Sequence, residues 1–425
     1  MRRWGLVWAG AMGTMVTMAT AACGDDKTGG SGPGDTTDTA SDVADTADTN
    51  TTDTKVLADT LDTSTPDTAD TADTAVADTT PDTVDTVDTV DTLDTFDTAV
   101  DTAPDVTVPP KEVRFIVMGD TGEGNERQYK VAEAIRQKCE RDGCDFAILL
   151  GDNIYDVGVT STMDAQWTAK FEDPYKNLDM PFYAVLGNHD NGGFLTQFLG
   201  DTFAGAGAEF ERGNYQVDYT RFSSKWKMPG RTYDFAAGPA HFFALDTNDM
   251  VWSLLNNGAE ARTQVQVDTL PAKIDQAPET WRIAFGHHPF LSNGQHGDAG
   301  AYEGLEENIT DLISGVPGLG DLSDVVTGDG VKDALDVIVC GRVDLYFAGH
   351  DHSRQWLADA PACPGTTFVV SGAGSKMTTL KERHPYLFQD VDNAGFFWVH
   401  LRDDALTAEA IDENGRLQWS HEAHK

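Results

Sequence analysis

The chain has 425 residues, and its 70 acidic side chains against 30 basic ones give a formal net charge of −40. That charge argues against binding to nucleic acids or to anionic membrane surfaces, because both are polyanions and repel an acidic protein. Residues 24–110 contain 22 Asp, no Glu and two Lys, so they carry −20, half of the total. The remaining 315 residues look globular and can bury about 75% of their unfolded surface in one domain.

We expect residues 1–22 to be a secretory signal peptide. Two arginines precede an apolar stretch that ends in small residues, and this stretch is too short and poorly flanked for a membrane-spanning helix. Cys23 follows directly, and residues 20–23 resemble a bacterial lipobox, whose Cys becomes lipid-modified, although Thr20 stands where Leu is usual. The resemblance implies an exported lipoprotein, periplasmic or at the cell surface. Cleavage near Ala22 without lipid, giving a secreted protein, and an uncleaved anchor are the alternatives.

Residues 23–110 hold the anchor Cys and a linker that we expect to be disordered. Asp-Thr recurs about every three residues, as in Asp82-Thr83-Val84-Asp85, and few large apolar side chains occur. Because little apolar surface is available to offset the entropy of folding, and like charges repel, this segment should stay extended as a tether. A calcium site on the Asp repeat is the alternative, but neither a Gly turn nor a terminal Glu completes a calcium-binding loop.

Cysteine usage fits an oxidising compartment. Apart from Cys23, the chain has an even number of cysteines, namely Cys139, Cys144, Cys340 and Cys363. Cys139 and Cys144 could close a small loop, and Cys340 and Cys363 would then form a second bridge. Because no Cys-x-x-Cys pair exists, a thiolate zinc site is not expected.

From residue 111 to 425 the sequence predicts alternating strands and helices. A helix is expected from about Arg127 to Arg141, and C-terminal strands at Phe396–Leu401, Ala405–Ile411 and Arg416–Ser420. Six apolar runs are expected as buried strands that end in a polar residue, usually after glycine: 113–118, 146–150, 182–186, 241–245, 282–285 and 343–348. Ligands bind beyond the carboxyl ends of strands in α/β sheets, so these ends predict a site.

The candidate ligands at these ends form a mixed oxygen and nitrogen set: Asp120, Asp152, Tyr155, Asn188, His287, His350 and His352. Such a set suits Fe, Mn or Zn and lacks the thiolates that select soft metals. Seven ligands exceed what one ion needs, so we expect two ions about 3.5–4 Å apart that share a carboxylate. For each residue a structural interpretation remains, such as a turn-forming Asp, an Asx turn at Asn188 or a core aromatic at Tyr155. His288 is the alternative to His287.

Five sequence blocks together resemble the motifs of the purple acid phosphatases, in particular the tartrate-resistant branch of the calcineurin-like metallophosphoesterases. They are Gly119-Asp120-Thr121-Gly122, Gly151-Asp152-Asn153-Ile154-Tyr155, Gly187-Asn188-His189-Asp190, Gly286-His287-His288-Pro289 and Gly349-His350-Asp351-His352. The resemblance covers about residues 112–425. It implies an α/β fold of two packed mixed β-sheets flanked by helices, in four layers α/β/β/α.

The resemblance also implies a ligand assignment. Asp120, Tyr155 and His352 would hold Fe(III), Asp152 would bridge, and Asn188, His287 and His350 would hold a divalent Fe, Zn or Mn ion. Generic members of the larger family carry a ligand His where Gly122 stands here, and Tyr155 can replace that ligand. A phenolate donor favours Fe(III) and would give a purple protein.

The implied activity is hydrolysis of phosphate monoesters by attack of a metal-bound hydroxide. His189 and His296 occupy positions that contact substrate and assist the leaving group in the family; the structural alternative is that both are merely exposed. Asn191 stands where the mammalian enzymes have another His, and loops around 315–320 and 328–330 should border the substrate, so specificity does not transfer.

The sequence therefore predicts an exported dimetal acid phosphatase that acts on small phosphoesters and meets a membrane only through its lipid anchor. The alternatives are a phosphodiesterase or nucleotidase with the same metals, a non-catalytic metal-binding surface lipoprotein, and an adhesin dominated by the Asp-Thr stalk. The sequence indicates neither the physiological ester nor the oligomeric state.

Overall fold

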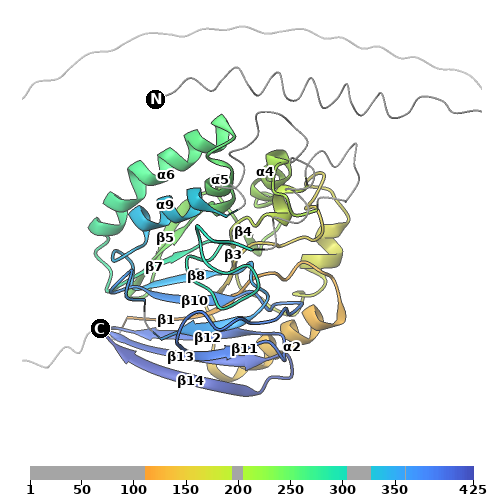
Figure 1. The fold of residues 1–425 in the computed structure, drawn as a ribbon. Helices are drawn as coiled ribbons and strands as arrows, with labels where there is room; N and C mark the ends of the chain where they lie inside the picture. Colours follow the sequence, from red (N-terminus) through yellow and green to blue (C-terminus); the bar gives the residue numbers. More distant parts are fainter. Residues whose placement is uncertain (1–110, 194–203, 304–326, 359) are drawn as a thin grey trace, which may run out of the picture. The chain divides into compact units, whose positions relative to one another are not determined.

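The computed structural model describes residues 111–193, 204–303, 327–358 and 360–425 (Figure 1). All of them belong to one unit of the chain, Thr107–Lys425. The predicted signal peptide, lipid-anchor Cys and Asp/Thr linker lie outside the described residues, as does the predicted substrate loop at 315–320. Those predictions therefore stay predictions.

Two seven-stranded mixed sheets form the unit, which confirms the predicted fold class. The first has the order β14-β13-β12-β1-β2-β3-β4, with β1 Glu112–Met118, β2 Phe146–Leu149, β3 Phe182–Ala184, β4 Trp226–Lys227, β12 Gly395–Arg402, β13 Ala405–Asp412 and β14 Leu417–His424. The second has the order β11-β9-β10-β8-β7-β6-β5, with β5 Tyr233–Ala237, β6 Ala240–Ala244, β7 Trp281–Phe285, β8 Leu345–Ala348, β9 Arg354–Leu357, β10 Thr367–Ser371 and β11 Tyr386–Asp390.

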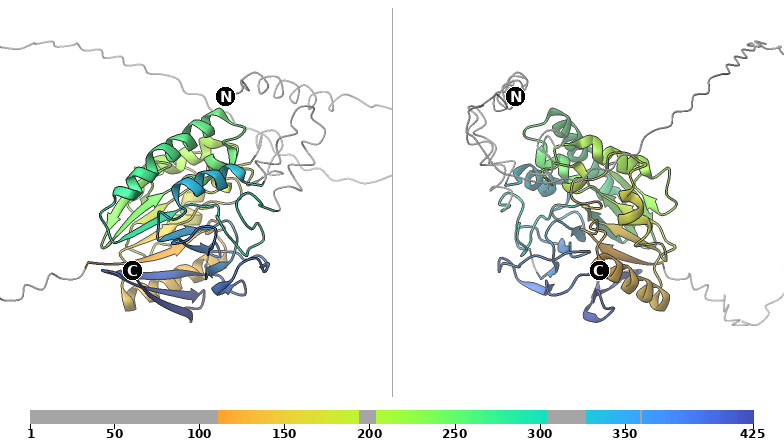
Figure 2. Two further views of the ribbon diagram at one scale, coloured as in Figure 1. Left: turned by 60° about the vertical axis from the view of Figure 1, so that its left-hand side comes forward. Right: turned by 90° about the vertical axis from the view of Figure 1, so that its right-hand side faces the viewer.

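The described helices lie on the outer faces of the sheets (Figures 1 and 2). They are α2 Glu126–Asp142, α4 Phe210–Tyr219, α5 Thr247–Trp252, α6 Asn257–Gln276 and α9 Asp329–Ile338, with a π-helical turn at Thr168–Glu172 and a 3-10 turn at His189–Asn191. Helix α2 packs against β12 and β13 of the first sheet, whereas α5, α6 and α9 pack together over the second. This arrangement gives the four layers that the resemblance implied.

The alternating direction of side chains along the strands explains the layers. On β1, Phe115 and Val117 enter the core between the two sheets, where they meet aromatic residues such as Phe242 and Phe347. The intervening residues Ile116 and Met118 face the opposite way, into the cluster that contains Val131 and Ile135 of α2. Because successive side chains point to opposite faces of a strand, a strand that is apolar throughout must be covered on both faces.

Parallel pairing brings the polar strand ends to the same edges of the two sheets. Strand β1 pairs in parallel with β2, and β2 with β3. In the second sheet β7 pairs in parallel with β8. The residues that follow these five strands therefore emerge on one side of each sheet, which is what the sequence pattern predicted.

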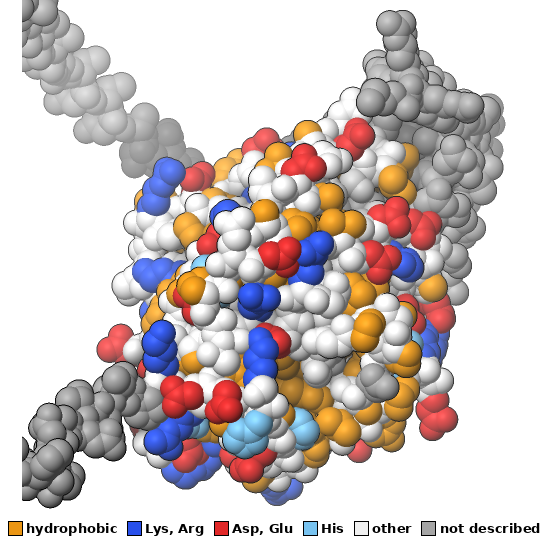
Figure 3. Space-filling model, turned by 90° about the vertical axis from the view of Figure 1, so that its left-hand side faces the viewer, with side chains coloured by type: hydrophobic (Ala, Val, Ile, Leu, Met, Phe, Trp, Pro, Cys, Tyr) orange, Lys and Arg blue, Asp and Glu red, His pale blue; other side chains and the backbone are white. Residues whose placement is uncertain are grey.

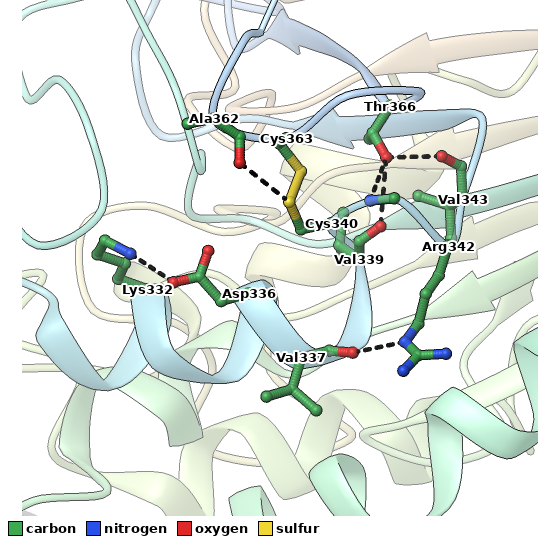
Figure 4. The surroundings of a disulfide bond; sticks show 11 residues. Lys332, Asp336, Val337, Val339, Cys340, Arg342, Val343, Ala362, Cys363 and Thr366 are labelled. Atoms are coloured by element: carbon green, nitrogen blue, oxygen red, sulfur yellow. Dashed lines mark hydrogen bonds and ion pairs between the residues drawn. A yellow bond between two sulfur atoms is a disulfide. The ribbon is translucent and has the colours of Figure 1, made fainter.

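The structure contains two disulfides, Cys139–Cys144 and Cys340–Cys363, which is the pairing that the sequence allowed but did not fix. The first closes the end of α2, where Gly143 terminates the helix at φ 82°. The second joins the segment after α9 to the segment before β10 (Figure 4). Beside it the Thr366 hydroxyl donates to the carbonyl of Val343 at 2.8 Å.

The surface carries mixed charge. In the face shown in Figure 3, acidic and basic side chains are interspersed rather than gathered by sign. Among the described residues no helix is long and apolar enough to cross a membrane.

Candidate metal centre

Five candidate ligands lie two to four residues past the ends of five strands, at the edges where the two sheets meet. They are Asp120 after β1, Asp152 after β2, Asn188 after β3, His287 after β7 and His350 after β8. The backbone ties these ends together, because the Asp120 N–H donates to the carbonyl of Gly151 at 2.9 Å, and the His350 N–H donates to a carboxylate oxygen of Asp120 at 3.0 Å. Residues 230 positions apart in the chain are thus held side by side.

The backbone at three of these positions is unusual. Asp120, Asp152 and His350 have φ values of 57°, 50° and 66°, in the left-handed region that residues with a Cβ rarely adopt. Such conformations cost on the order of 1–3 kcal/mol each and cluster at functional sites. The neighbouring glycines are needed as well, since a Cβ on Gly187 would lie 2.2 Å from the Asp152 carboxylate and one on Gly349 2.5 Å from that of Asp120.

One group of ligands gathers around the Tyr155 hydroxyl. Its oxygen lies 3.0 Å from a carboxylate oxygen of Asp120 and 3.2 Å from Nε2 of His352. Nε2 of His352 is 3.4 Å from the same Asp120 oxygen. Three donor atoms at these separations can surround a single cation.

The backbone around Gly122 leaves no room for a side chain at this position. A Cβ at Gly122 would lie 2.3 Å from the carbonyl of Asn153, so no larger side chain fits without moving the backbone. The Tyr155 N–H donates to the Gly122 carbonyl at 3.0 Å, which fixes Tyr155 relative to the Asp120 loop. The position of the generic His ligand is closed, and Tyr155 supplies a donor atom at the same group.

A second group gathers around the Asn188 amide oxygen. That oxygen lies 2.8 Å from Nε2 of His287 and 3.2 Å from Nδ1 of His350. The two imidazole nitrogens are themselves 3.2 Å apart. All three side chains are buried.

Asp152 connects the two groups. One of its carboxylate oxygens lies 3.0 Å from the Tyr155 hydroxyl and 3.5 Å from Nε2 of His287. Its other oxygen accepts from the His189 N–H at 2.9 Å. Asp152 is thus the candidate whose carboxylate lies within 3.5 Å of side-chain donor atoms in both groups.

Hydrogen-bond chemistry shows that the residues fit bound cations. The Asn188 amide nitrogen donates to Gly205 at 2.7 Å, so its oxygen faces His287, whose Nδ1 lies 2.8 Å from the Leu150 carbonyl. In the neutral ring that contact leaves Nε2 as an acceptor. Two acceptors 2.8 Å apart need a proton or a metal ion between them.

The electrostatics of the site reflect burial and neighbouring acidic groups. Burial, followed by the neighbouring Asp152, raises the pKa of Asp120 to about 8, although His287 opposes the shift. Burial would also raise the pKa of Asp152, but His287, His189 and the His189 N–H outweigh it, and that pKa is lowered. Burial lowers the pKa of His350, and it lowers that of His352 to about 3. Neutral imidazoles beside carboxylates are the forms that bind metal.

His189 and His296 flank the two groups and are both partly exposed. The ring centroids of His189 and Tyr155 are 4.5 Å apart, and those of His296 and His350 are 4.3 Å apart. Nδ1 of His189 is 2.6 Å from the Asp156 carbonyl, and Nδ1 of His296 is 2.9 Å from that of Glu303. Each ring is therefore held through Nδ1, and within the described residues its Nε2 has no hydrogen-bond partner.

The structure also separates His287 from His288. Nδ1 of His288 lies 2.9 Å from the Thr247 hydroxyl, on the side of α5, while Nε2 of His287 faces Asn188. His288 is nevertheless close enough to form a possible three-His group with His287 and His350. Asn191 is buried behind the site and accepts from Arg231 at 2.9 Å, so it does not replace a substrate-contacting His.

Sequence reasoning gave no role to three residues that organise the site. Buried Asp190 accepts from the N–H groups of Gly187 and Asn153 at 2.8 and 2.9 Å and so links two ligand loops. Asp351 accepts from the His296 N–H at 2.7 Å. Lys376 lies over the Tyr155 ring. Both aspartates stand beside ligand residues within the motifs, which could have indicated them, whereas Lys376 lies in a loop without such a signal.

Comparisons with known proteins agree with this geometry. The family model for the calcineurin-like phosphoesterases matches residues 113–354, more than half of the chain. Tartrate-resistant acid phosphatase type 5 of Sus scrofa is 27% identical over 344 residues, covering 73% of this chain and 86% of the relative. Purple acid phosphatase 7 of Arabidopsis thaliana is 28% identical over 278 residues, covering 62% and 70%.

A solved structure shares the fold. GAP50, described as the anchor in the inner membrane complex of Plasmodium, superposes with a TM-score of 0.53 at 20% identity. The match covers 74% of this chain and 89% of that one.

Proposed function

The chain belongs to the calcineurin-like phosphoesterase family and is a phosphoric ester hydrolase, and on that premise we propose that it is an acid phosphatase that hydrolyses phosphate monoesters at a two-metal centre. The observation that carries the proposal is the contact of Asp152 with both ligand groups, at 3.0 Å to Tyr155 and 3.5 Å to His287. A shared carboxylate is what a pair of ions needs if both are to act on one phosphate.

The two ligand groups support different ions. Asp120, Tyr155 and His352 would hold Fe(III), because a carboxylate and a phenol oxygen are hard donors that suit a trivalent ion. Asn188, His287 and His350 would hold a divalent Fe, Zn or Mn ion, with Asp152 bridging. The ions would supply charge to neutralise the phosphate in the transition state and an activated water for hydrolysis.

The flanking histidines support the handling of substrate. Because the Nδ1 atoms of His189 and His296 are bound to backbone carbonyls, their Nε2 atoms are available to the phosphate or the leaving oxygen. A His positioned in this way can hold a proton and pass it to the leaving alkoxide, which is general acid catalysis. Burial lowers the pKa of His189, so this ring favours the neutral form, in which Nε2 accepts a hydrogen bond, as it would from the hydroxyl of a protonated phosphate. His296 is the proposed proton donor.

Export also remains part of the proposal. The two disulfides, Cys139–Cys144 and Cys340–Cys363, support an oxidising compartment, since disulfides are rare in the reducing cytosol. A lipid anchor at Cys23 would place the enzyme in the periplasm or at the cell surface. Metabolic labelling with a fatty acid, compared between the wild type and Cys23→Ala, tests the anchor; an unlabelled wild type contradicts it.

A substrate panel tests the activity. We expect the metal-loaded protein to hydrolyse phosphate monoesters in acid more efficiently than matched diesters, judged by kcat/KM. Preference for diesters or for nucleotides would instead support the phosphodiesterase or nucleotidase alternative. No hydrolysis of any ester by protein that retains two ions would support the non-catalytic alternative.

A further inference from the structure

We propose that Lys376 is a positioning residue of the Tyr155 side of the metal centre, where its ammonium group holds the phenol ring and stabilises the donor electrons of the phenol oxygen. The inference rests on the proposed function in one respect, the assignment of Fe(III) to the group that contains Tyr155. It adds a residue to that side of the site that the ligand pattern does not include.

The geometry is that of a close cation–π contact. Nζ of Lys376 lies 3.3 Å from the centroid of the Tyr155 ring, well within the ~6 Å at which such contacts act. The Tyr155 side chain is buried, and the Lys376 side chain is only 28% exposed, so little water screens the interaction. On its other side Nζ lies 2.8 Å from a carboxylate oxygen of Glu123.

The loop that carries Lys376 is held by contacts with the Asp120 loop and with the start of α2. The loop after β10 packs on the Asp120 loop, since the Ser375 hydroxyl donates to the Asp120 carbonyl at 2.5 Å and the Gly374 N–H donates to the Gly119 carbonyl at 3.1 Å. The side-chain amide of Asn125, which caps α2, donates to the Ser375 carbonyl at 3.0 Å. The backbone next to Lys376 is therefore hydrogen-bonded to the Asp120 loop and to the start of α2.

Lys376 differs in kind from other cations near the site. Among the described residues it is the one Lys or Arg whose charged group contacts the side chain of a candidate ligand. Lys170 also reaches Tyr155, but it donates to the backbone carbonyl. The ammonium group of Lys376 thus lies between the Tyr155 ring and the Glu123 carboxylate.

This placement has an electronic consequence that can be measured. A positive charge over the ring lowers the energy of the phenol electrons more than it lowers that of the more distant iron acceptor level. Transfer of an electron from the phenolate to Fe(III) by light then requires more energy. Lys376 should therefore hold the visible absorption band of the iron-loaded protein at a shorter wavelength than Tyr155 alone would give.

The test compares visible spectra of iron-loaded variants. We expect Lys376→Met to shift the band to longer wavelength while the band itself is retained, and Lys376→Arg to restore the wild-type position. Lys381→Met is the matched control, because this lysine lies in the same loop, pairs with Glu303 and makes no described contact with Tyr155. A band that stays in place in Lys376→Met, or that moves equally in Lys381→Met, overturns the inference.

A second variant covers the case in which Lys376→Met does not fold. Glu123→Gln removes the carboxylate that neutralises Lys376 and leaves the lysine in place, so the band should move to shorter wavelength. No shift in that variant contradicts the inference. A colourless iron-loaded wild type contradicts the iron assignment and this inference together, whereas a coloured wild type with an unresponsive band contradicts this inference alone.

Discussion

The two halves of the metal centre differ in the charge of their donors. The half around Tyr155 combines a carboxylate, a phenol and one imidazole, whereas the half around Asn188 combines a neutral amide and two imidazoles. Anionic oxygens stabilise a higher charge on an ion than neutral nitrogens and amides do. One carboxylate, Asp152, joins an anionic half to a neutral half, and this difference supports the proposed pair of unlike ions.

Loss of the shared residue should have the largest effect. We expect Asp152→Asn to lower kcat by about 10⁴-fold, since two-metal charge stabilisation is worth several kcal/mol and each 1.36 kcal/mol is tenfold. Both ions should be retained poorly, as measured by elemental analysis after desalting. Asp156→Asn is the matched control, because this carboxylate lies on the exposed surface one residue past Tyr155. Full activity in Asp152→Asn would contradict the bridging role.

Variants that change a ligand of only one half should lose only the ion of that half. We expect His350→Ala to lose the divalent ion and about 10³-fold in kcat while the iron colour remains, because the loss of one Lewis acid removes several kcal/mol of stabilisation. Tyr155→Phe should lose the colour yet retain the divalent ion. Metal content and the visible spectrum are measured on the same samples. Loss of both ions in each variant would show that the halves are not independent.

The proposed proton donor should show a substrate-dependent effect. We expect His296→Asn to reduce kcat about 10²-fold for alkyl phosphates, whose leaving groups need a proton, and much less for nitrophenyl phosphate. His189→Asn should raise KM more than it lowers kcat, since its role is to bind phosphate. Equal losses for both leaving groups in His296→Asn would remove it from proton transfer.

Metal removal should lower the free energy of unfolding of the domain, and this effect should be smaller than the effects of the variants on kcat. Anything that binds the folded state alone stabilises it by RT ln(1 + [L]/Kd), about 2.7 kcal/mol at a hundredfold excess over Kd. We therefore expect chelation to lower Tm, and Asp152→Asn to remove most of this dependence. A metal-free Tm equal to the loaded one would show that the ligand set forms its contacts without cations.

Much of the metal centre could be predicted because most of its ligands have a recognisable pattern in the neighbouring sequence. A buried strand fixes where a side chain starts, and a following glycine lets the next residue approach its neighbours, as with Gly349 beside Asp120. Five such strand ends indicated five of the seven candidate ligands, whereas the fold of two packed sheets was implied by the family resemblance of the five sequence blocks. The helix at 127–141 and the three C-terminal strands were recognisable from their own periodicity and are present as α2 and β12–β14.

Other features depend on contacts that no local pattern carries. Lys376 acquires its place over Tyr155 from a loop that packs on β1 more than 200 residues earlier, and nothing around residue 376 indicates a ligand. Strands β9 and β11 were not predicted, because Arg354–Leu357 and Tyr386–Asp390 are short and lack an apolar run. They become strands through pairing, since β9 pairs with β10 and β11 pairs with β9.

Anomalous diffraction at the iron and zinc absorption edges, from crystals loaded with both metals, tests the two-ion centre most directly. We expect two peaks about 3.5–4 Å apart on either side of the Asp152 carboxylate. The iron peak should lie beside Tyr155 and the zinc peak beside Asn188. A single peak, or iron bound beside Asn188 and zinc beside Tyr155, would contradict the assignment of unlike ions to the two halves.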